Sequence, residues 1–279
     1  MAEITAAAVG KLREMTNAGL MDCKKALTES GGDLNLAVEV LRKKGIASAS
    51  AKGAREAKEG VIVQYVQPGA KLGVLVEINC ETDFVARNDT FKAFCDEIAR
   101  KIAANPSADF EADRVAAVTK IGENIRISRH QRLEVSGNGM IAAYIHTGGK
   151  VGVLVEVGAG KESTVAHDDF KQLVRDITLQ IAAAHPVSVS REEVDPAVIA
   201  KEKEIAGEQV KNKPPQAVAK IIEGKLEKFF QTYCLVDQGF VKKNSEVSVK
   251  EHIASVAKQL GDEIAVRRFL RFQVGEVSA

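Results

Sequence analysis

The sequence has no tryptophan, only three tyrosines and ten phenylalanines among its 279 residues, and no surplus of charge of either sign. Lysine and arginine number 39 against 38 aspartates and glutamates, so the net charge is +1 at pH 7. A near-neutral chain is a poor candidate for direct nucleic-acid binding, because neutralising phosphates requires a strongly basic surface. The shortage of aromatic rings also argues against recognition of bases by stacking.

The chain also has few cysteines and no long apolar run. Cys23, Cys80, Cys95 and Cys234 are far apart and form none of the close pairs typical of a zinc site or a redox motif. No segment approaches the roughly 18 apolar residues of a membrane span, and the first residues lack the basic and apolar regions of a secretory signal. These observations predict a cytoplasmic protein with reduced thiols and with no metal, cofactor or membrane partner.

Motifs for catalysis are missing as well. Gly158-Ala-Gly160-Lys161 is faintly similar to a phosphate-binding loop, but Val155 and Glu162 occupy the positions where that loop has a glycine and a hydroxyl residue. The five histidines have no metal-ligand spacing, and no nucleophile stands at a recognisable spacing from a base. We therefore predict that the protein is not an enzyme. The alternative, an enzyme built on the core, would need a deep polar pocket with perturbed carboxylates.

A small helical region comes first in the chain. Residues 3–45 have the apolar spacing of three short helices, with Asp33 as the N-cap of the third and Gly45 at its end. Residues 47–58 are rich in alanine, serine, lysine and glycine, which is typical of a linker. We predict a three-helix domain with its linker over residues 1–54, suited to binding a partner. A domain that serves only stability is the simpler alternative.

An internal repeat makes up most of the remaining chain. Residues 60–104 return 79 residues later without a gap, and roughly 17 of about 45 positions are identical. Each copy has the pattern of a two-stranded hairpin followed by a helix that covers the sheet. A weaker echo of residues 120–135 returns 139 residues later, so the second copy has about 60 extra residues. We predict an α+β core of two related halves, residues 55–137 with the order ββα-α-β and residues 138–279.

The extra residues of the second half have the pattern of two helices. Asp195-Pro196 begins a charged helical stretch, Pro214-Pro215 turns the chain, and an apolar stripe returns from Val218 to Phe229. Two helices joined by a short turn pack antiparallel. We therefore predict an inserted helical hairpin over about residues 190–235 that projects from the body.

The two copies differ most in the loop after their second strand. The first copy reads Asn79-Cys-Glu-Thr-Asp-Phe-Val-Ala-Arg87, where the second has Gly158-Ala-Gly-Lys-Glu-Ser-Thr-Val-Ala166. Phe84 therefore aligns with Ser163, so the fold does not require a phenylalanine in this loop. An aromatic residue beside Asp83 in such a loop is typical of a protruding binding tip, and anchors of this kind commonly contribute about 2 kcal/mol or more to an interface. A place for Phe84 in the core is the alternative.

Two long segments of the chain resemble the signatures of the elongation factor Ts family, the guanine-nucleotide exchange factors for elongation factor Tu in translation. They are residues Leu12–Leu27 and Glu77–Arg87, and the closing segment Phe269–Glu276 is similar as well. The resemblance extends from Ala2 to Gly275. It implies a ubiquitin-associated-like three-helix head, a core of two α+β halves and a coiled-coil hairpin in the second half.

The resemblance also implies which residues contact Tu. Thr82, Asp83, Phe84 and Val85 match the tip that enters between helices of the nucleotide-binding domain of Tu and disturbs the groups holding Mg²⁺ and the phosphates, which releases GDP. Other matching positions at the partner surface are Leu20, Met21 and Lys24 in the head, Ile121, Gly122 and His146 in the core, and Val241 in the second half. Such a factor needs no cofactor and no direct nucleic-acid partner. The alternative is a non-catalytic adaptor that binds another folded protein through its helical head.

Overall fold

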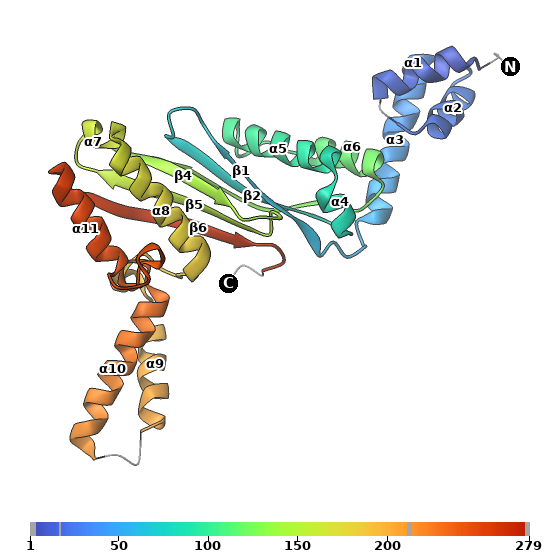
Figure 1. The fold of residues 1–279 in the computed structure, drawn as a ribbon. Helices are drawn as coiled ribbons and strands as arrows, with labels where there is room; N and C mark the ends of the chain where they lie inside the picture. Colours follow the sequence, from blue (N-terminus) through green and yellow to red (C-terminus); the bar gives the residue numbers. More distant parts are fainter. Residues whose placement is uncertain (1–3, 17, 211–213, 277–279) are drawn as a thin grey trace.

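The computed structural model describes residues 4–16, 18–210 and 214–276. This part of the chain forms a three-helix head, a body of two sheets with their covering helices, and a helical hairpin that extends from the body (Figure 1). The helices of the head are α1 (Ala6–Thr16), α2 (Leu20–Glu29) and α3 (Leu34–Lys52). They bury a small apolar core that includes Leu12, Cys23 and Leu27. The three predicted helices are confirmed, whereas the likeness to a ubiquitin-associated domain stays a prediction.

Helix α3 is longer than the sequence predicted. Asp33 is its N-cap as expected, because the carboxylate accepts two backbone N–H groups of the first turn at 2.8 and 3.1 Å. The prediction that the helix ends at Gly45 was wrong: it continues to Lys52 and includes half of the expected linker. Its last turns pack on the first half of the core, where Ala49 is fully buried and a Cβ atom at Gly45 would lie 2.8 Å from the hydroxyl of Thr119. Tertiary packing thus overrides a linker-like composition.

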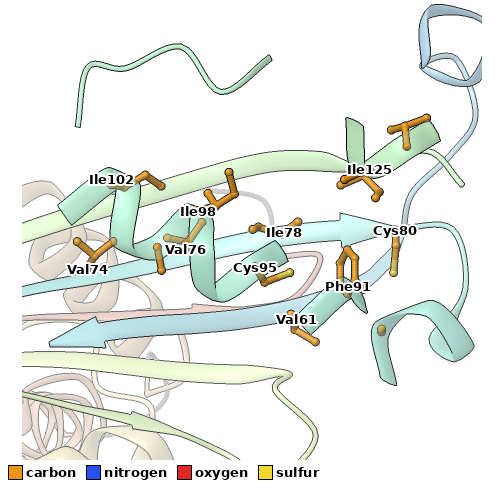
Figure 2. Close-up of a cluster of buried hydrophobic side chains, with 14 of the residues drawn as sticks. Val61, Val74, Val76, Ile78, Cys80, Phe91, Cys95, Ile98, Ile102 and Ile125 are labelled. Carbon is orange, nitrogen blue, oxygen red and sulfur yellow. The ribbon is translucent and has the colours of Figure 1, made fainter. Parts of the chain in front are cut away.

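The first half has the predicted order ββα-α-β. Strands β1 (Glu59–Val66), β2 (Leu72–Cys80) and β3 (Arg126–Glu134) form an antiparallel sheet with β2 in the centre. Between β2 and β3 come α4 (Asp83–Arg87), α5 (Asp89–Ala104) and α6 (Glu111–Ile121). Helix α5 places an apolar stripe on one face of this sheet, as Figure 2 shows for Phe91, Cys95, Ile98 and Ile102 above Val74, Val76 and Ile78.

The second half repeats this arrangement. Its corresponding elements are β4 (Gly139–Ile145), β5 (Val151–Ala159), α7 (Glu162–Ala166), α8 (Asp168–Ala184), α11 (Val249–Leu260) and β6 (Ile264–Gln273). The strands form an antiparallel sheet in the order β4-β5-β6, and α8 packs on one face of it. Even a β-bulge is repeated, next to Glu77 in one sheet and next to Glu156 in the other. The internal repeat of the sequence is therefore a structural repeat.

The inserted segment forms the predicted hairpin. Helices α9 (Pro196–Glu208) and α10 (Pro215–Tyr233) pack against each other and project from the body (Figure 1). Three short 3-10 turns at its base are η1 (Arg191–Glu193), η2 (Leu235–Asp237) and η3 (Val241–Lys243). The guanidinium of Arg191 joins the base of the hairpin by donating to Glu227 of α10 at 2.7 Å and to Asp237 at 2.9 Å.

The two sheets pack face to face, which the sequence did not predict. The face of each sheet opposite its helices contributes to one shared apolar cluster, formed by Ile62, Leu75, Leu133, Ile141, Leu154 and Phe272. The body therefore has helix, sheet, sheet and helix layers. Strand β2 is covered on both faces, so all of its nine residues are buried. This explains why residues 72–78 are so rich in apolar side chains instead of alternating with polar ones.

The contact between the sheets has approximate twofold symmetry. Gly73 of β2 lies against the second sheet and its repeat partner Gly152 of β5 lies against the first. A Cβ atom at either position would be 2.6 or 2.4 Å from the nearest isoleucine methyl group, so both positions need glycine. Isoleucine N–H groups also donate across the contact in both directions, Ile62 to the carbonyl of Gly149 at 2.6 Å and Ile141 to that of Ala70 at 2.8 Å. Each half thus presents the same surface to the other, as in a homodimer.

A buried glutamate on each central strand extends this symmetry. Glu77 and Glu156 are 3% and 1% exposed. The Glu77 carboxylate accepts from Arg129 of its own sheet at 2.7 Å and from the backbone N–H of Gly275, in the other half, at 2.9 Å. The Glu156 carboxylate likewise accepts from Arg268 of its own sheet at 2.7 Å and from the backbone N–H of Ser136, in the other half, at 2.9 Å. Each half therefore fixes the chain that leaves the last strand of the other half.

Candidate functional site

The loop between β2 and α5 contains the predicted binding tip. Thr82 is extended and acts as the N-cap of α4, because its hydroxyl oxygen accepts the N–H of Val85 at 3.3 Å. Asp83 begins the helix and forms an ion pair with Arg87, one turn later, at 3.0 Å. The residues between Asp83 and Arg87, which include Phe84, therefore lie on a single helical turn whose start is fixed by the Thr82 N-cap.

Phe84 points away from the rest of the protein. Its side chain is 81% exposed, the largest fraction among the exposed large apolar residues of the described chain. Helix α4 packs on the core of the first half through buried Ala86 and partly buried Val85, which leaves Phe84 on the outer side of the turn. Ser163, at the same position of α7, is exposed as well. The alternative that Phe84 belongs to the core is therefore wrong.

A carboxylate from the end of α6 contacts this loop. Helix α6 ends at Ile121, and Gly122 is its left-handed C-cap with φ +92°. The carboxylate of the next residue, Glu123, accepts the N–H groups of Glu81 and Thr82, both at 3.0 Å, and the hydroxyl of Thr82 at 2.6 Å. The predicted positions Ile121 and Gly122 thus lie beside the tip, although about 40 residues separate the two segments in the sequence.

His146 brings the second half to the same site. It follows β4, and its Nδ1 is 2.9 Å from the hydroxyl oxygen of Tyr144. His146 and Arg87 of α4 line one pocket of about 410 Å³, together with apolar side chains of β1. The tip of the first half and a histidine of the second half therefore share one surface.

A second pocket joins His146 to Val241. This pocket of about 450 Å³ is lined by His146 and Val241, with Tyr144 and Leu179 among the residues between them. Val241 is 41% exposed, and its N–H donates to the buried side-chain oxygen of Gln180 at 2.9 Å. Each part of the core site thus lies beside the next. Besides Thr82 and Val85, the site contains six predicted positions, namely Asp83, Phe84, Ile121, Gly122, His146 and Val241.

The predicted head residues form a second surface. Leu20, Met21 and Lys24 are all exposed in the first part of α2, where Leu20 is 52% and Met21 61% exposed. Their spacings of three and four residues place Lys24 on the same side of the helix as both apolar residues. Figure 1 shows α2 in the head, apart from the two sheets. The predicted positions therefore lie on two surfaces, one on the head and one on the core.

The four cysteines are buried, and burial raises the pKa of the Cys80 thiol to about 12 and also raises that of Cys95. Protonated, buried thiols are poor nucleophiles. The described residues contain no group of three or more histidine, cysteine or acidic side chains placed to hold a metal ion. Within the same ranges, none of the helices combines the length and the apolarity that a bilayer crossing requires.

Two residues of the core site were not predicted from the sequence. Glu123 had a signal in the repeat, because it follows the glycine that ends α6 just as Asp262 follows Gly261 after α11. Arg87 had a weaker one, its spacing of four residues from Asp83, which matters only if this short segment is helical. Neither signal shows by itself which loop the side chain reaches.

Comparisons with known proteins agree on one family. The family model described as "Elongation factor TS" matches residues 81–276. Proteins named elongation factor Ts from Symbiobacterium thermophilum and Clostridium botulinum are 45% and 44% identical to this chain over 285 and 290 residues, and these matches cover 99% and 98% of this chain and 93% of each relative. The elongation factor Ts of Nitratidesulfovibrio vulgaris is 39% identical over 280 residues, with 99% of this chain and 97% of the relative covered.

Proposed function

This chain belongs to the elongation factor Ts family, which makes it a translation elongation factor, and we propose that it is a guanine-nucleotide exchange factor that promotes GDP release from elongation factor Tu. The observation that carries the proposal is the exposure of Phe84, at 81%, on a helical turn whose repeat counterpart has Ser163. An exposed aromatic ring that the fold does not need is suited to anchor an interface with a partner, because buried aromatic side chains contribute much of the binding energy of such interfaces.

In the proposed complex, Phe84 enters between helices of the nucleotide-binding domain of Tu, with Asp83 beside it. The ring displaces the groups that hold Mg²⁺ and the phosphates, so GDP leaves. A factor that binds nucleotide-free Tu more tightly than Tu·GDP must lower the affinity for GDP by the same ratio, because binding linkage is reciprocal. This mechanism is differential binding, so the factor needs no covalent step, no catalytic group and no cofactor of its own, and it is not an enzyme in that sense.

The remaining predicted positions would orient the tip on Tu. His146 lies between two pockets that can accept apolar side chains of a partner, and Val241 extends this surface. On the head, Leu20 and Met21 are exposed apolar side chains, each of which stabilises an interface by about 1.5–3 kcal/mol when fully buried. Lys24 adds a positive charge beside them. Two separate surfaces would hold Tu while the tip acts.

Stopped-flow measurement of labelled GDP release from Tu tests the proposal. We expect the wild-type protein to accelerate release. Phe84→Ala should slow this accelerated release by more than tenfold, because a lost anchor of about 2 kcal/mol corresponds to a factor of about 30. Ser163→Ala is the matched control and should leave the rate unchanged. An unchanged rate for Phe84→Ala would refute the wedge, and no acceleration by the wild type would refute the exchange function.

An adaptor that binds another protein through the head is the second candidate, since Leu20 and Met21 are exposed there. It predicts that Met21→Ala abolishes binding of the partner and that Phe84→Ala leaves binding unchanged. The exchange function predicts a different pattern. Met21→Ala should raise the concentration of factor needed for half-maximal GDP release and leave the maximal rate nearly unchanged, because the head would bind Tu without disturbing its nucleotide.

A further inference from the structure

The helical turn that presents Phe84 has little support of its own. Helix α4 has five residues, and a helix this short does not persist in isolation because its nucleation is unfavourable. Its apolar contact with the core is made by Ala86 and Val85, and Phe84 itself is exposed. The direction of the ring therefore depends on how the start of the turn is held.

Glu123 holds that start. Its Oε2 accepts the N–H groups of Glu81 and Thr82, both at 3.0 Å, and its Oε1 accepts the Thr82 hydroxyl at 2.6 Å. The hydroxyl has one hydrogen, so its donation to Glu123 leaves the oxygen free to accept the N–H of Val85. Hydrogen bonds to an ionised carboxylate are stronger than those between neutral groups. The Glu123 carboxylate thus fixes both the backbone before the turn and its N-cap.

The two segments bind each other in both directions. The Glu81 carboxylate accepts the N–H of Asn124 at 2.6 Å, while Glu123 accepts the N–H of Glu81. The Glu81 side chain therefore reaches the chain that follows α6, and the Glu123 side chain reaches the chain that precedes α4. Glu81 also lies 3.6 Å from the guanidinium of Arg55. This reciprocal pairing makes the tip and the end of α6 one unit.

The second copy has a similar device without the ring, although its hydroxyl donor is Thr164, which aligns with Val85 and not with Thr82. Asp262 follows the left-handed Gly261 at the end of α11, and its Oδ2 accepts the N–H of Lys161 at 2.9 Å and the hydroxyl of Thr164 at 2.5 Å. An acidic residue after the helix-ending glycine therefore closes the strand-to-helix loop in both halves. Only the first half combines this acidic residue with an exposed phenylalanine. Comparing variants of the two acidic residues therefore distinguishes a role in folding from an effect on the tip.

We propose that Glu123 is a positioning residue for exchange, whose carboxylate holds Thr82 so that Phe84 is presented to Tu in one direction. The inference rests on the proposed exchange function and adds the residue that makes the tip rigid. A tip that is ordered before binding loses less freedom in the complex, so more of its contact energy is available to displace the nucleotide. Loss of the Glu123 hydrogen bonds should therefore lower the maximal rate of GDP release more than it weakens the affinity for Tu.

The test is GDP release from Tu at several factor concentrations, for Glu123→Ala and for its matched control Asp262→Ala. Glu123→Ala should lower the maximal release rate at least about tenfold and change the half-saturating concentration less than about threefold, because the other surfaces remain. Asp262→Ala removes the corresponding carboxylate of the second half, with its bonds to the Lys161 N–H and the Thr164 hydroxyl, and should leave the maximal rate within about twofold of the wild type. Circular dichroism melting compares the cost to folding of the two variants.

Two further variants separate positioning from a loss of structure. Glu123→Gln keeps the volume of the side chain but has only one acceptor oxygen, and it should give a smaller reduction; it replaces Glu123→Ala if that variant does not fold. In the Phe84→Ala background, Glu123→Ala should slow release by less than about twofold, because the ring through which it acts is gone. An equal loss for Asp262→Ala, or additive losses in the double variant, overturns the inference.

The outcomes also separate this inference from the proposed function. If the wild type does not accelerate GDP release, or if Phe84→Ala has the wild-type rate, the exchange mechanism fails and the positioning role fails with it. If the wild type accelerates release, Phe84→Ala is slow and Glu123→Ala retains the wild-type maximal rate, the exchange mechanism stands and the positioning role alone is wrong.

Discussion

The loops that follow the central strands of the two halves are the same structure with different surfaces. Both contain one turn of helix, α4 in the first half and α7 in the second, and both are anchored by an acidic residue after a left-handed glycine. The first loop has a side-chain N-cap at Thr82, whereas Lys161 makes no side-chain cap at the same position. The first also presents Phe84 where the second has Ser163. What the copies share is what the fold requires, and what they do not share indicates what a partner requires.

The largest effect should come from exchanging the two loops. A variant in which residues 82–85 are replaced by Lys-Glu-Ser-Thr, the sequence of residues 161–164, should still fold because the second half already contains that loop. It should slow Tu-dependent GDP release about 100-fold or more, since both the anchor ring and its cap are lost. Stopped-flow release measures the effect.

The reverse exchange is the control. Placing Thr-Asp-Phe-Val at residues 161–164 should leave the wild-type rate unchanged and should not restore activity to the first variant. The reason is that one of the pockets beside His146 adjoins α4, where Arg87 lines it. Full activity from the transplanted tip would show that the ring acts without its surroundings, contrary to the proposal.

The next effect concerns the buried glutamate on the central strand of each half. Glu77→Ala and Glu156→Ala each remove a buried carboxylate. Glu77 accepts from Arg129, and Glu156 accepts from both Arg267 and Arg268. Breaking such a pair costs about 3 kcal/mol of folding free energy. Urea unfolding should give a loss for both variants, and the larger loss for Glu156→Ala, because Glu156 pairs with two arginines. A loss confined to one variant would contradict the symmetry of the contact between the halves.

The free energy of unfolding at acid pH provides a further test for Glu156. Burial alone would raise the pKa of Glu156, but the N–H of Ser136 and the guanidinium groups of Arg268 and Arg267 outweigh it and hold the pKa below its ordinary value. As the pH falls, the unfolded chain therefore takes up the proton first. The stabilisation by Glu156 is complete above the ordinary pKa of about 4.3 and is lost as the pH falls through the lowered pKa.

Glu156→Gln removes this titration. Its free energy of unfolding should be lower than that of the wild type at pH 7 and should fall less steeply between about pH 5 and pH 3. Urea unfolding at a series of pH values gives both numbers. Parallel curves for wild type and variant would mean that the ionised form of Glu156 does not stabilise the fold.

The smallest effect tests the close approach of the sheets. Gly73→Ala and Gly152→Ala would each place a Cβ atom within 2.7 Å of side-chain atoms from the other sheet, and should each destabilise the protein by about 2 kcal/mol. Thermal unfolding should show similar shifts for both. Gly224→Ala is the control, because nothing lies within 4 Å of its Cβ position in helix α10 and alanine favours a helix. A stable Gly73→Ala would contradict the face-to-face packing.

The local parts of the fold could be predicted because they depend on short-range patterns. The hairpins, the helix that covers each sheet and the inserted α9–α10 hairpin follow from apolar spacing, proline and the repeat. The end of α3 could not be predicted, since residues 46–52 remain helical only because Ala49 is buried against the first half. The packing of the two sheets could not be predicted either, because a buried strand such as β2 does not reveal which element covers its second face.

The sequence by itself determined the twofold repeat, the position of the insertion and the difference between Phe84 and Ser163, because each is a relation between residues along one chain. The tertiary structure alone decided that Phe84 points outward, that Glu123 holds the turn presenting it, and that His146 of the other half lies beside that turn. These contacts join segments tens of residues apart. The position of His146 beside the turn also depends on the packing of the two sheets at Gly73 and Gly152, where the absence of a side chain lets the halves meet.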